Sequence, residues 1–280
     1  MSPETVYQYA LAQGLEHRVA LEIASVVADI RPRALIQTNA KNKTILSSIL
    51  KELGIRISFS REMTMVQAEG TLDYTLVEPD NCEQEQNSTS LEIWIESPSN
   101  PYKTNLTLPP KDTWLGYPDC CIKAYNEITS IRDCYNNYSL SSPKFNWTIN
   151  KFSGMFSDFC PFLDFFPCNL QCEKAIELVH PLVDLAARCM PKQNFNSMVS
   201  TMKTPLLLTK ECLFSLTGAT HAKGTLSALA DKTQKVGWPH SAASGESVTQ
   251  LILPDDWPEI SAVNLSSSNN EMVTIEIPYC

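Results

Sequence analysis

The chain has 280 residues, enough for one large domain or two modest ones. Hydrophobic residues make up 43% of it and charged residues 19%, a balance typical of folded globular proteins and not of disordered ones. The net charge is −9 and the 22 lysines and arginines form no run, which argues against binding to the phosphate backbone of nucleic acids.

The start of the chain lacks the basic region and apolar core of a secretion signal. No segment approaches 18 consecutive apolar residues, so we expect no membrane span. Both observations predict a cytoplasmic protein, in which thiols stay reduced. A secreted domain held by disulfides is the alternative, because the chain contains six Asn-x-Ser/Thr sequons. These begin at Asn42, Asn87, Asn105, Asn137, Asn146 and Asn264.

The first 110 residues alternate between helical and strand-like periodicity. Ser2 and Pro3 are suited to begin the first helix. The strand–helix–strand run over 31–60 resembles a βαβ unit, whose crossover is normally right-handed. No glycine-rich nucleotide fingerprint occurs here. The predicted helices span 3–13, 15–30 and 39–54, and the predicted strands span 31–38, 55–60, 71–78 and 91–97.

The rest of the chain divides by composition. A connector rich in Pro, Ser and Asn leads into a largely helical stretch with seven of the ten cysteines, and short strand candidates follow. We therefore predict an α+β fold, packed as one body or as two closely joined ones. Its three sections are an N-terminal α/β section (1–110), a helical cysteine-bearing middle (111–203) and a β-rich C-terminal section (204–280).

Two adjacent cysteines follow a Gly-Tyr-Pro turn in the middle section. Pro118 fits the first position of a helix, and Asp119 then suits the positive end of the helix dipole. Cys120 and Cys121 fall in the first turn, where unpaired backbone N–H groups stabilise a thiolate. Adjacent helical residues point about 100° apart, so we expect only one of the two thiols to face any given site.

A second cysteine pair follows Pro167 about fifty residues later. Cys168 and Cys172 are four residues apart, which predicts two thiols side by side on the first turns of a helix running to about Cys189. Cys160, also followed by proline, lies eight residues before Cys168. If the two helix starts meet, the thiols form a cluster suited to zinc, an iron–sulfur cluster or a redox dithiol. The candidate metal ligands are Cys120, Cys121, Cys168 and Cys172.

The same cysteines also fit a packing role. Cys172 continues an apolar stripe on its predicted helix, and cysteine often packs as a small buried hydrophobe. That stripe contains Ala175, Ile176, Val179, Val183 and Ala186. The cysteines outside the two motifs are interpreted as incidental. They are Cys82, Cys134, Cys189, Cys212 and Cys280.

The stretches LGYPDCCIKAY and FFPCNLQCEKAIEL resemble a prokaryotic family of unknown function, whose members carry Gly-Tyr-Pro-x-Cys-Cys and Pro-Cys-x-x-x-Cys motifs. The resemblance covers about 114–216 and extends weakly over the α/β section. It implies a thiol site but supplies no reaction. Some members have a histidine before Pro-Cys, where this chain has Phe165 and Phe166, which puts a histidine ligand or base in doubt here. The matching positions are Gly116, Tyr117, Pro118, Cys120, Cys121, Pro167, Cys168 and Cys172.

Other candidates are weaker. His180 would lie about 12 Å along the helix axis from Cys172, too far to share one metal ion. His221 and His240 could each supply a fourth ligand or a general base from a loop. The carboxylates of LPDDWPE could do acid–base chemistry but are typical of a solvated loop; they are Asp255, Asp256 and Glu259. Five phenylalanines before Cys168 could line an apolar pocket or belong to the core.

The sequence thus predicts a cytosolic protein whose cysteine thiolates bind a metal or an iron–sulfur cluster, or act as a redox or nucleophilic thiol on a small molecule. Without an adjacent histidine, a cluster or an open metal position fits better than a closed structural zinc. The alternative is a non-enzymatic binding or scaffold protein whose cysteines are buried and structural. The sequence assigns no catalytic residue.

Overall fold

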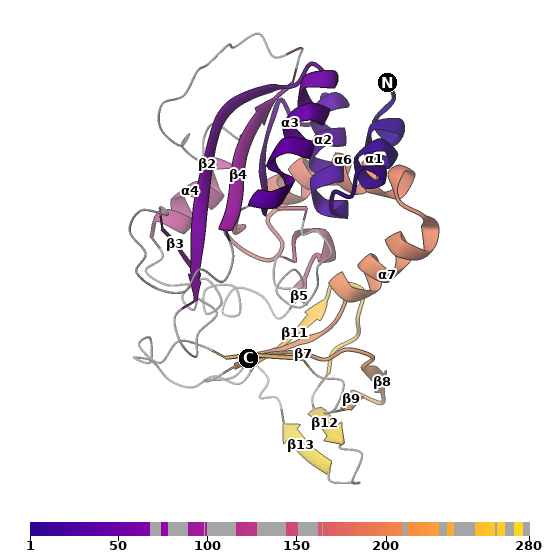
Figure 1. Cartoon of the computed structure of the whole chain (residues 1–280). Coiled ribbons are helices and arrows are strands. Elements are labelled where there is room, and N and C mark those ends of the chain that lie inside the picture. The colour runs from indigo at the N-terminus through magenta and orange to yellow at the C-terminus, as the bar shows by residue number, and fades with distance from the viewer. Residues whose placement is uncertain are drawn as a thin grey trace. The chain divides into compact units, whose positions relative to one another are not determined.

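The fold is α+β, as the sequence predicts, with helices and strands mixed along the chain in this computed structural model (Figure 1). The chain folds into two compact units, Met1–Ile122 with Leu178–Phe195 and Lys123–Glu177 with Asn196–Cys280. The division into three sections stays a prediction. The structure describes residues 1–67, 74–77, 89–97, 99, 116–127, 144–150, 162–163, 165–208, 212–229, 234–237, 250–260, 262–266 and 272–276.

Two helices begin the first unit. Helix α1 (Pro3–Ala12) starts as predicted, because the Ser2 side chain accepts a hydrogen bond from the Thr5 backbone N–H at 3.2 Å. Helix α2 (His17–Val27) ends three residues before the predicted Ile30. The chain turns there because Asp29 adopts a φ of 52°, and the Ile30 N–H bonds back to the Ser25 carbonyl at 3.1 Å.

The sheet of the first unit has the order β1-β4-β2-β3, and every neighbouring pair in it is antiparallel. The predicted βαβ unit is split, because β4 lies between β1 and β2 and pairs with both. The 3₁₀ helix η1 and helix α3 connect β1 to β2. The bounds are β1 (Arg33–Asn39), η1 (Ala40–Asn42), α3 (Lys43–Glu52), β2 (Arg56–Gln67), β3 (Tyr74–Val77) and β4 (Thr89–Glu96).

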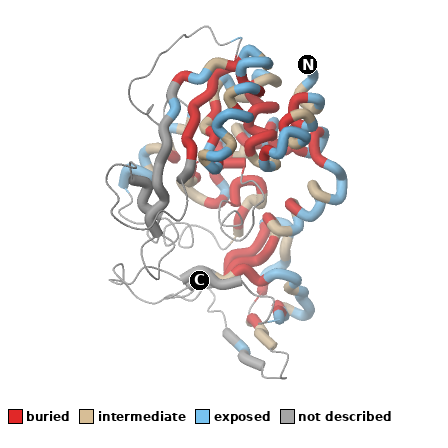
Figure 2. The backbone as a smooth tube through the Cα atoms, viewed as in Figure 1, coloured by how far each residue is buried: buried red, intermediate tan, exposed pale blue. Residues whose placement is uncertain are grey.

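Strand β4 is buried on both faces, which explains its nearly continuous burial in Figure 2. One face pairs Ile93 and Ile95 with the apolar side chains of β1. The opposite face carries Glu96, which has no exposed surface and forms ion pairs with Arg33 and Arg56, the residues directly across from it on the two flanking strands. The carboxylate of these cross-strand pairs is fully buried, and the two arginine side chains are partly buried.

The second unit contains two further sheets, with the orders β10-β7-β6-β11-β5 and β13-β12-β9-β8. The strand candidates of the C-terminal section correspond to β6, β7, β11 and β13, whereas β8, β9, β10 and β12 were not predicted from the sequence. The bounds are β5 (Lys144–Phe145), β6 (Leu206–Leu208), β7 (Cys212–Ser215), β8 (Thr220–Ala222), β9 (Thr225–Leu229), β10 (Gln234–Gly237), β11 (Gln250–Pro254), β12 (Ala262–Ser266) and β13 (Met272–Glu276).

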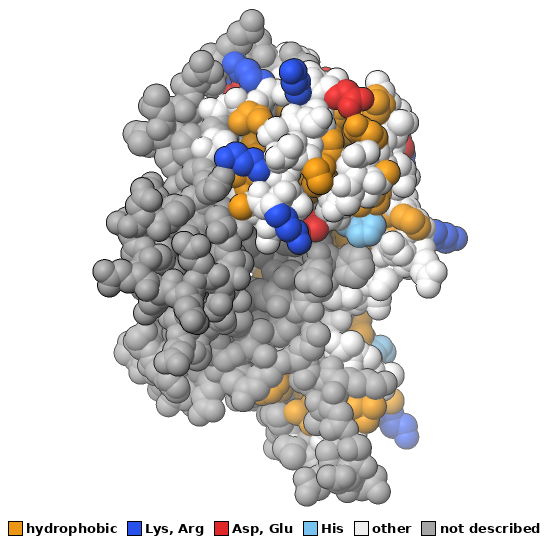
Figure 3. All heavy atoms as spheres, viewed as in Figure 1, with side chains coloured by type: hydrophobic (Ala, Val, Ile, Leu, Met, Phe, Trp, Pro, Cys, Tyr) orange, Lys and Arg blue, Asp and Glu red, His pale blue; other side chains and the backbone are white. Residues whose placement is uncertain are grey.

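The remaining helices include the two that neighbour the cysteine motifs. Helix α6 ends at Cys189, as predicted, and Pro181 lies inside it. No helix in the described residues is long and apolar enough to cross a membrane. On the face in Figure 3, the lysine and arginine side chains lie apart from one another. The bounds are α4 (Asp119–Asn126), η4 (Trp147–Ile149), α6 (Glu173–Cys189) and α7 (Lys192–Met202).

Candidate metal centre

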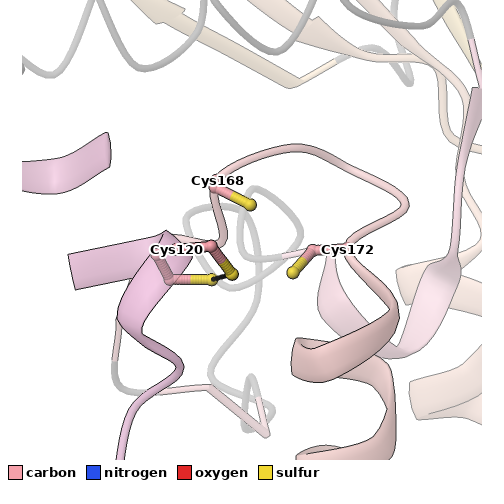
Figure 4. A group of neighbouring side chains, drawn as sticks. Cys120, Cys168 and Cys172 are labelled. Carbon is pink, nitrogen blue, oxygen red and sulfur yellow. Dashed lines mark hydrogen bonds between the residues drawn. The ribbon is translucent and has the colours of Figure 1, made fainter. Parts of the chain in front are cut away.

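Four sulfur atoms converge at one place in the structure. The Sγ atoms of Cys120, Cys121, Cys168 and Cys172 all lie within 4.8 Å of one another. Figure 4 shows the labelled side chains of Cys120, Cys168 and Cys172 directed toward a common centre. These are the four candidate ligands predicted from the sequence, and together they form a group that could hold a metal ion.

The first thiol pair is positioned by the start of α4. Gly116 adopts a φ of 76°, a left-handed conformation that favours glycine, and this turns the chain into the helix. The Pro118 carbonyl accepts hydrogen bonds from the N–H groups of Cys121 at 2.9 Å and Ile122 at 3.0 Å. The helix itself begins at Asp119, so both cysteines lie in its first turn as predicted.

Both members of the pair face the site, and the expectation that only one would do so is wrong. The sulfur atoms of Cys120 and Cys121 are 3.9 Å apart. Although the two Cα–Cβ bonds diverge by about 100°, each sulfur lies one rotatable bond further out, and rotation about χ1 brings the two together. Cys121 is 1% exposed and Cys120 is half-buried.

The second thiol pair lies in a turn and not on a helix, contrary to the prediction. Helix α6 begins only at Glu173, and Cys172 immediately precedes it. The Leu170 carbonyl accepts a hydrogen bond from the distant Asn146 N–H at 2.9 Å and so does not take part in a helical turn. A turn also folds Cys168 back toward Cys172, so the pair converges without the helical spacing.

Asn169 organises this turn, and the sequence reasoning did not identify it. Its backbone carbonyl accepts a hydrogen bond from the Cys172 N–H at 3.3 Å, and its side-chain Oδ1 accepts one from the Gln171 N–H at 2.9 Å. Its side-chain Nδ2 donates to the sulfur of Cys168 at 3.6 Å. Asparagine is a typical turn residue because its side chain bonds the backbone two residues on, and this was the available signal.

The four cysteines differ in burial. Cys121 and Cys172 are buried, whereas Cys120 and Cys168 are only partly buried. The burial of Cys172 agrees with the predicted apolar stripe. Of the five phenylalanines considered as a pocket, two lie outside the described residues, two are buried in the core, and Phe166 stacks on the ring of Tyr125 with centroids 6.3 Å apart.

The other cysteines are elsewhere or lie outside the described residues. Cys189, at the end of α6, is buried, and desolvation raises the pKa of its thiol to about 11. Strand β7 contains Cys212. Among the described cysteines whose side chains are placed, none forms a disulfide. Outside the described residues lie Cys82, Cys134, Cys160 and Cys280.

The histidines of the described residues do not join the four sulfur atoms. His180 is exposed on α6 and lies 3.6 Å from the carboxylate of Asp184. His221 packs its ring against Trp257, with centroids 4.9 Å apart. His240 lies outside the described residues. The part of the chain that the structure describes therefore offers a ligand set of sulfur alone.

The carboxylates of the LPDDWPE segment are exposed, which agrees with the interpretation of a solvated loop. Asp256 forms an ion pair with Lys203 at 2.7 Å, and Asp255 accepts a hydrogen bond from Asn146 at 3.4 Å. Glu259 is exposed as well. These contacts tie the segment to its neighbours and do not bring two carboxylates into a shared buried position, which acid–base catalysis would favour.

Comparisons of the chain with protein-family models, with curated proteins and with solved structures found no match.

Proposed function

We propose that the chain binds one metal ion, zinc by preference, through the thiolates of Cys120, Cys121, Cys168 and Cys172. The observation that supports this proposal is the mutual spacing of the four sulfur atoms, all within 4.8 Å. Zinc holds four thiolates at about 2.3 Å in a tetrahedron, which separates the sulfur atoms by about 3.8 Å. Small side-chain rotations are enough to reach that spacing from the one observed.

The spacing favours a single ion over an iron–sulfur cluster. In a four-iron cluster each thiolate binds a different iron, so the sulfur atoms must lie farther apart than around one ion. In a two-iron cluster two thiolates bind each iron, and the two pairs are again separated. The sequence predicted that three thiols face the site, and three ligands favoured a cluster or a metal ion with an open position. The convergence of the fourth supports a closed site instead.

A closed site of four thiolates has a structural role. Four protein ligands complete the tetrahedron, so no position is left for water or substrate. The ion would join α4 to the turn before α6, and its binding energy would add to the folding energy of the protein. A reducing compartment such as the cytoplasm would keep the ligands as thiols. The resemblance to the family with the two cysteine motifs supports the same four residues.

The rival is a protein whose cysteines pack as core without any metal. The burial of Cys121 and Cys172 is compatible with it. Simple packing, however, gives no reason for four sulfur atoms to gather, two of them only half-buried. A cysteine that acts only as a small hydrophobe needs no other sulfur nearby, and Cys189 is buried without belonging to the group of four.

Metal analysis and absorption spectroscopy of protein purified without oxygen test the proposal. We expect about one zinc ion per chain, no visible absorption, and strong thiolate-to-metal charge transfer after replacement of zinc by Co²⁺. Iron with acid-labile sulfide would instead indicate a cluster, and no metal after reconstitution would favour the rival. Thiol counts before and after reduction test the disulfide alternative. Cys168→Ala should abolish stoichiometric loading, whereas the matched control Cys189→Ala should not.

A further inference from the structure

We infer that Asn169 is a positioning residue of the metal centre, which orients the thiolate of Cys168 and lowers its reactivity toward electrophiles. The inference rests on the proposed function, because it concerns a ligand of the same site. It begins from the hydrogen bond in which the Asn169 Nδ2 donates to the sulfur of Cys168 at 3.6 Å. Side chains that bond metal ligands fix the orientation of those ligands and tune the metal.

Three hydrogen bonds fix the orientation of Asn169 in the turn. The side-chain Oδ1 accepts from the Gln171 N–H at 2.9 Å, and the backbone carbonyl accepts from the Cys172 N–H at 3.3 Å. With Oδ1 held in this way, the amide plane presents Nδ2 to the sulfur of Cys168. One residue therefore bonds to both cysteines of the turn, to the Cys168 thiol through its side chain and to the Cys172 backbone through its carbonyl.

The bond acts on one of the two less buried cysteines of the group. Cys168 is half-buried, whereas Cys172 and Cys121 are buried. A thiolate reacts through its negative charge, and an N–H donor takes up part of that charge. A metal-bound thiolate that accepts this bond should attack an alkylating agent more slowly and stay bound to the metal longer. Asn169 thus protects one of the two partly buried ligands of the site.

The competing explanation is that Asn169 only forms the turn. Two variants separate the two roles. Asn169→Asp keeps the Oδ1 acceptor but lacks the N–H donor, and Asn169→Ser keeps a shorter acceptor without adding charge. If the donor matters, both variants should behave alike. The control is Gln171→Ala, because only the backbone N–H of Gln171 takes part in the turn.

The experiment measures alkylation of Cys168 by iodoacetamide in zinc-loaded protein, with the modified residue mapped by mass spectrometry. We expect about tenfold faster alkylation of Cys168 in Asn169→Asp and Asn169→Ser, with zinc still bound at the start. The charge-transfer bands of the Co²⁺ forms should move to lower energy. Gln171→Ala should match the wild-type protein in both measurements.

Wild-type rates and spectra in both Asn169 variants would overturn the inference while leaving the metal site in place. A change in Asn169→Asp alone would assign the effect to the added charge and would also overturn it. Loss of zinc from both variants before alkylation, with the fold retained by circular dichroism, would mean that the residue only forms the turn. Failure of the wild-type protein to bind zinc or Co²⁺ would reject the proposed function itself.

Discussion

Replacing one ligand should remove the stabilisation that the metal gives, and a matched buried cysteine allows this effect to be isolated. We compare Cys121→Ser with Cys189→Ser. Cys121 is 1% exposed and Cys189 is 4% exposed, so each substitution places a hydroxyl in a buried position. Both should therefore destabilise the metal-free protein by about 1–3 kcal/mol. Only Cys121 belongs to the group of four sulfur atoms.

The metal-dependent difference can be given a magnitude. Binding of zinc to a structural site is worth about 10–16 kcal/mol, or about 3 kcal/mol for each of four ligands, so loss of one thiolate should weaken binding about 100-fold. At free zinc 100 times the wild-type Kd, the wild-type protein gains about 2.7 kcal/mol of stability. A variant that binds 100-fold more weakly gains about 0.4 kcal/mol under the same conditions.

The assay is denaturant unfolding of the three proteins in zinc-buffered solution and in chelator. We expect the zinc-dependent gain to stay near 2.7 kcal/mol in Cys189→Ser and to fall by about 2.3 kcal/mol in Cys121→Ser. The two variants should be equally destabilised in chelator. An equal zinc-dependent gain in both would mean that Cys121 is not a ligand, and it would contradict the inference from the sulfur spacing.

Three further predictions concern other described contacts. Burial raises the pKa of the Cys189 thiol to about 11, so its contribution to the free energy of unfolding is complete below about pH 9 and is lost as the pH rises toward 11. In Cys189→Ala the free energy of unfolding, measured across that pH range, should fall less than in the wild-type protein. Glu96→Gln should lower the free energy of unfolding by about 3 kcal/mol because it leaves two arginines of the sheet without their buried partner, and an effect below 1 kcal/mol would contradict the ion-pair assignment. Tyr125→Ala should weaken zinc binding about threefold by removing the stack on Phe166, whereas Tyr125→Phe should bind normally by isothermal calorimetry.

The sequence alone identified the start of the helix that carries the first thiol pair and the helix that follows the second pair. The start of α4 follows from a turn glycine, a proline and an acidic first turn, and the apolar stripe of α6 follows from its helical period. These are local rules, because caps and periodicity involve residues within one or two turns. For the same reason the C-terminal ends of α1 and α6 were predicted to within a residue.

Only the tertiary structure decided how these elements meet. Three features depend on contacts between residues far apart in the chain. They are the insertion of β4 between β1 and β2, the turn at Asn169 held by the bond between Leu170 and Asn146, and the meeting of the Cys120–Cys121 pair with the second thiol pair. A local pattern specifies that a residue is apolar or can bear a thiolate, but not which distant partner it meets. That partner is set by tertiary contacts, and the four sulfur atoms lie together only in the folded chain.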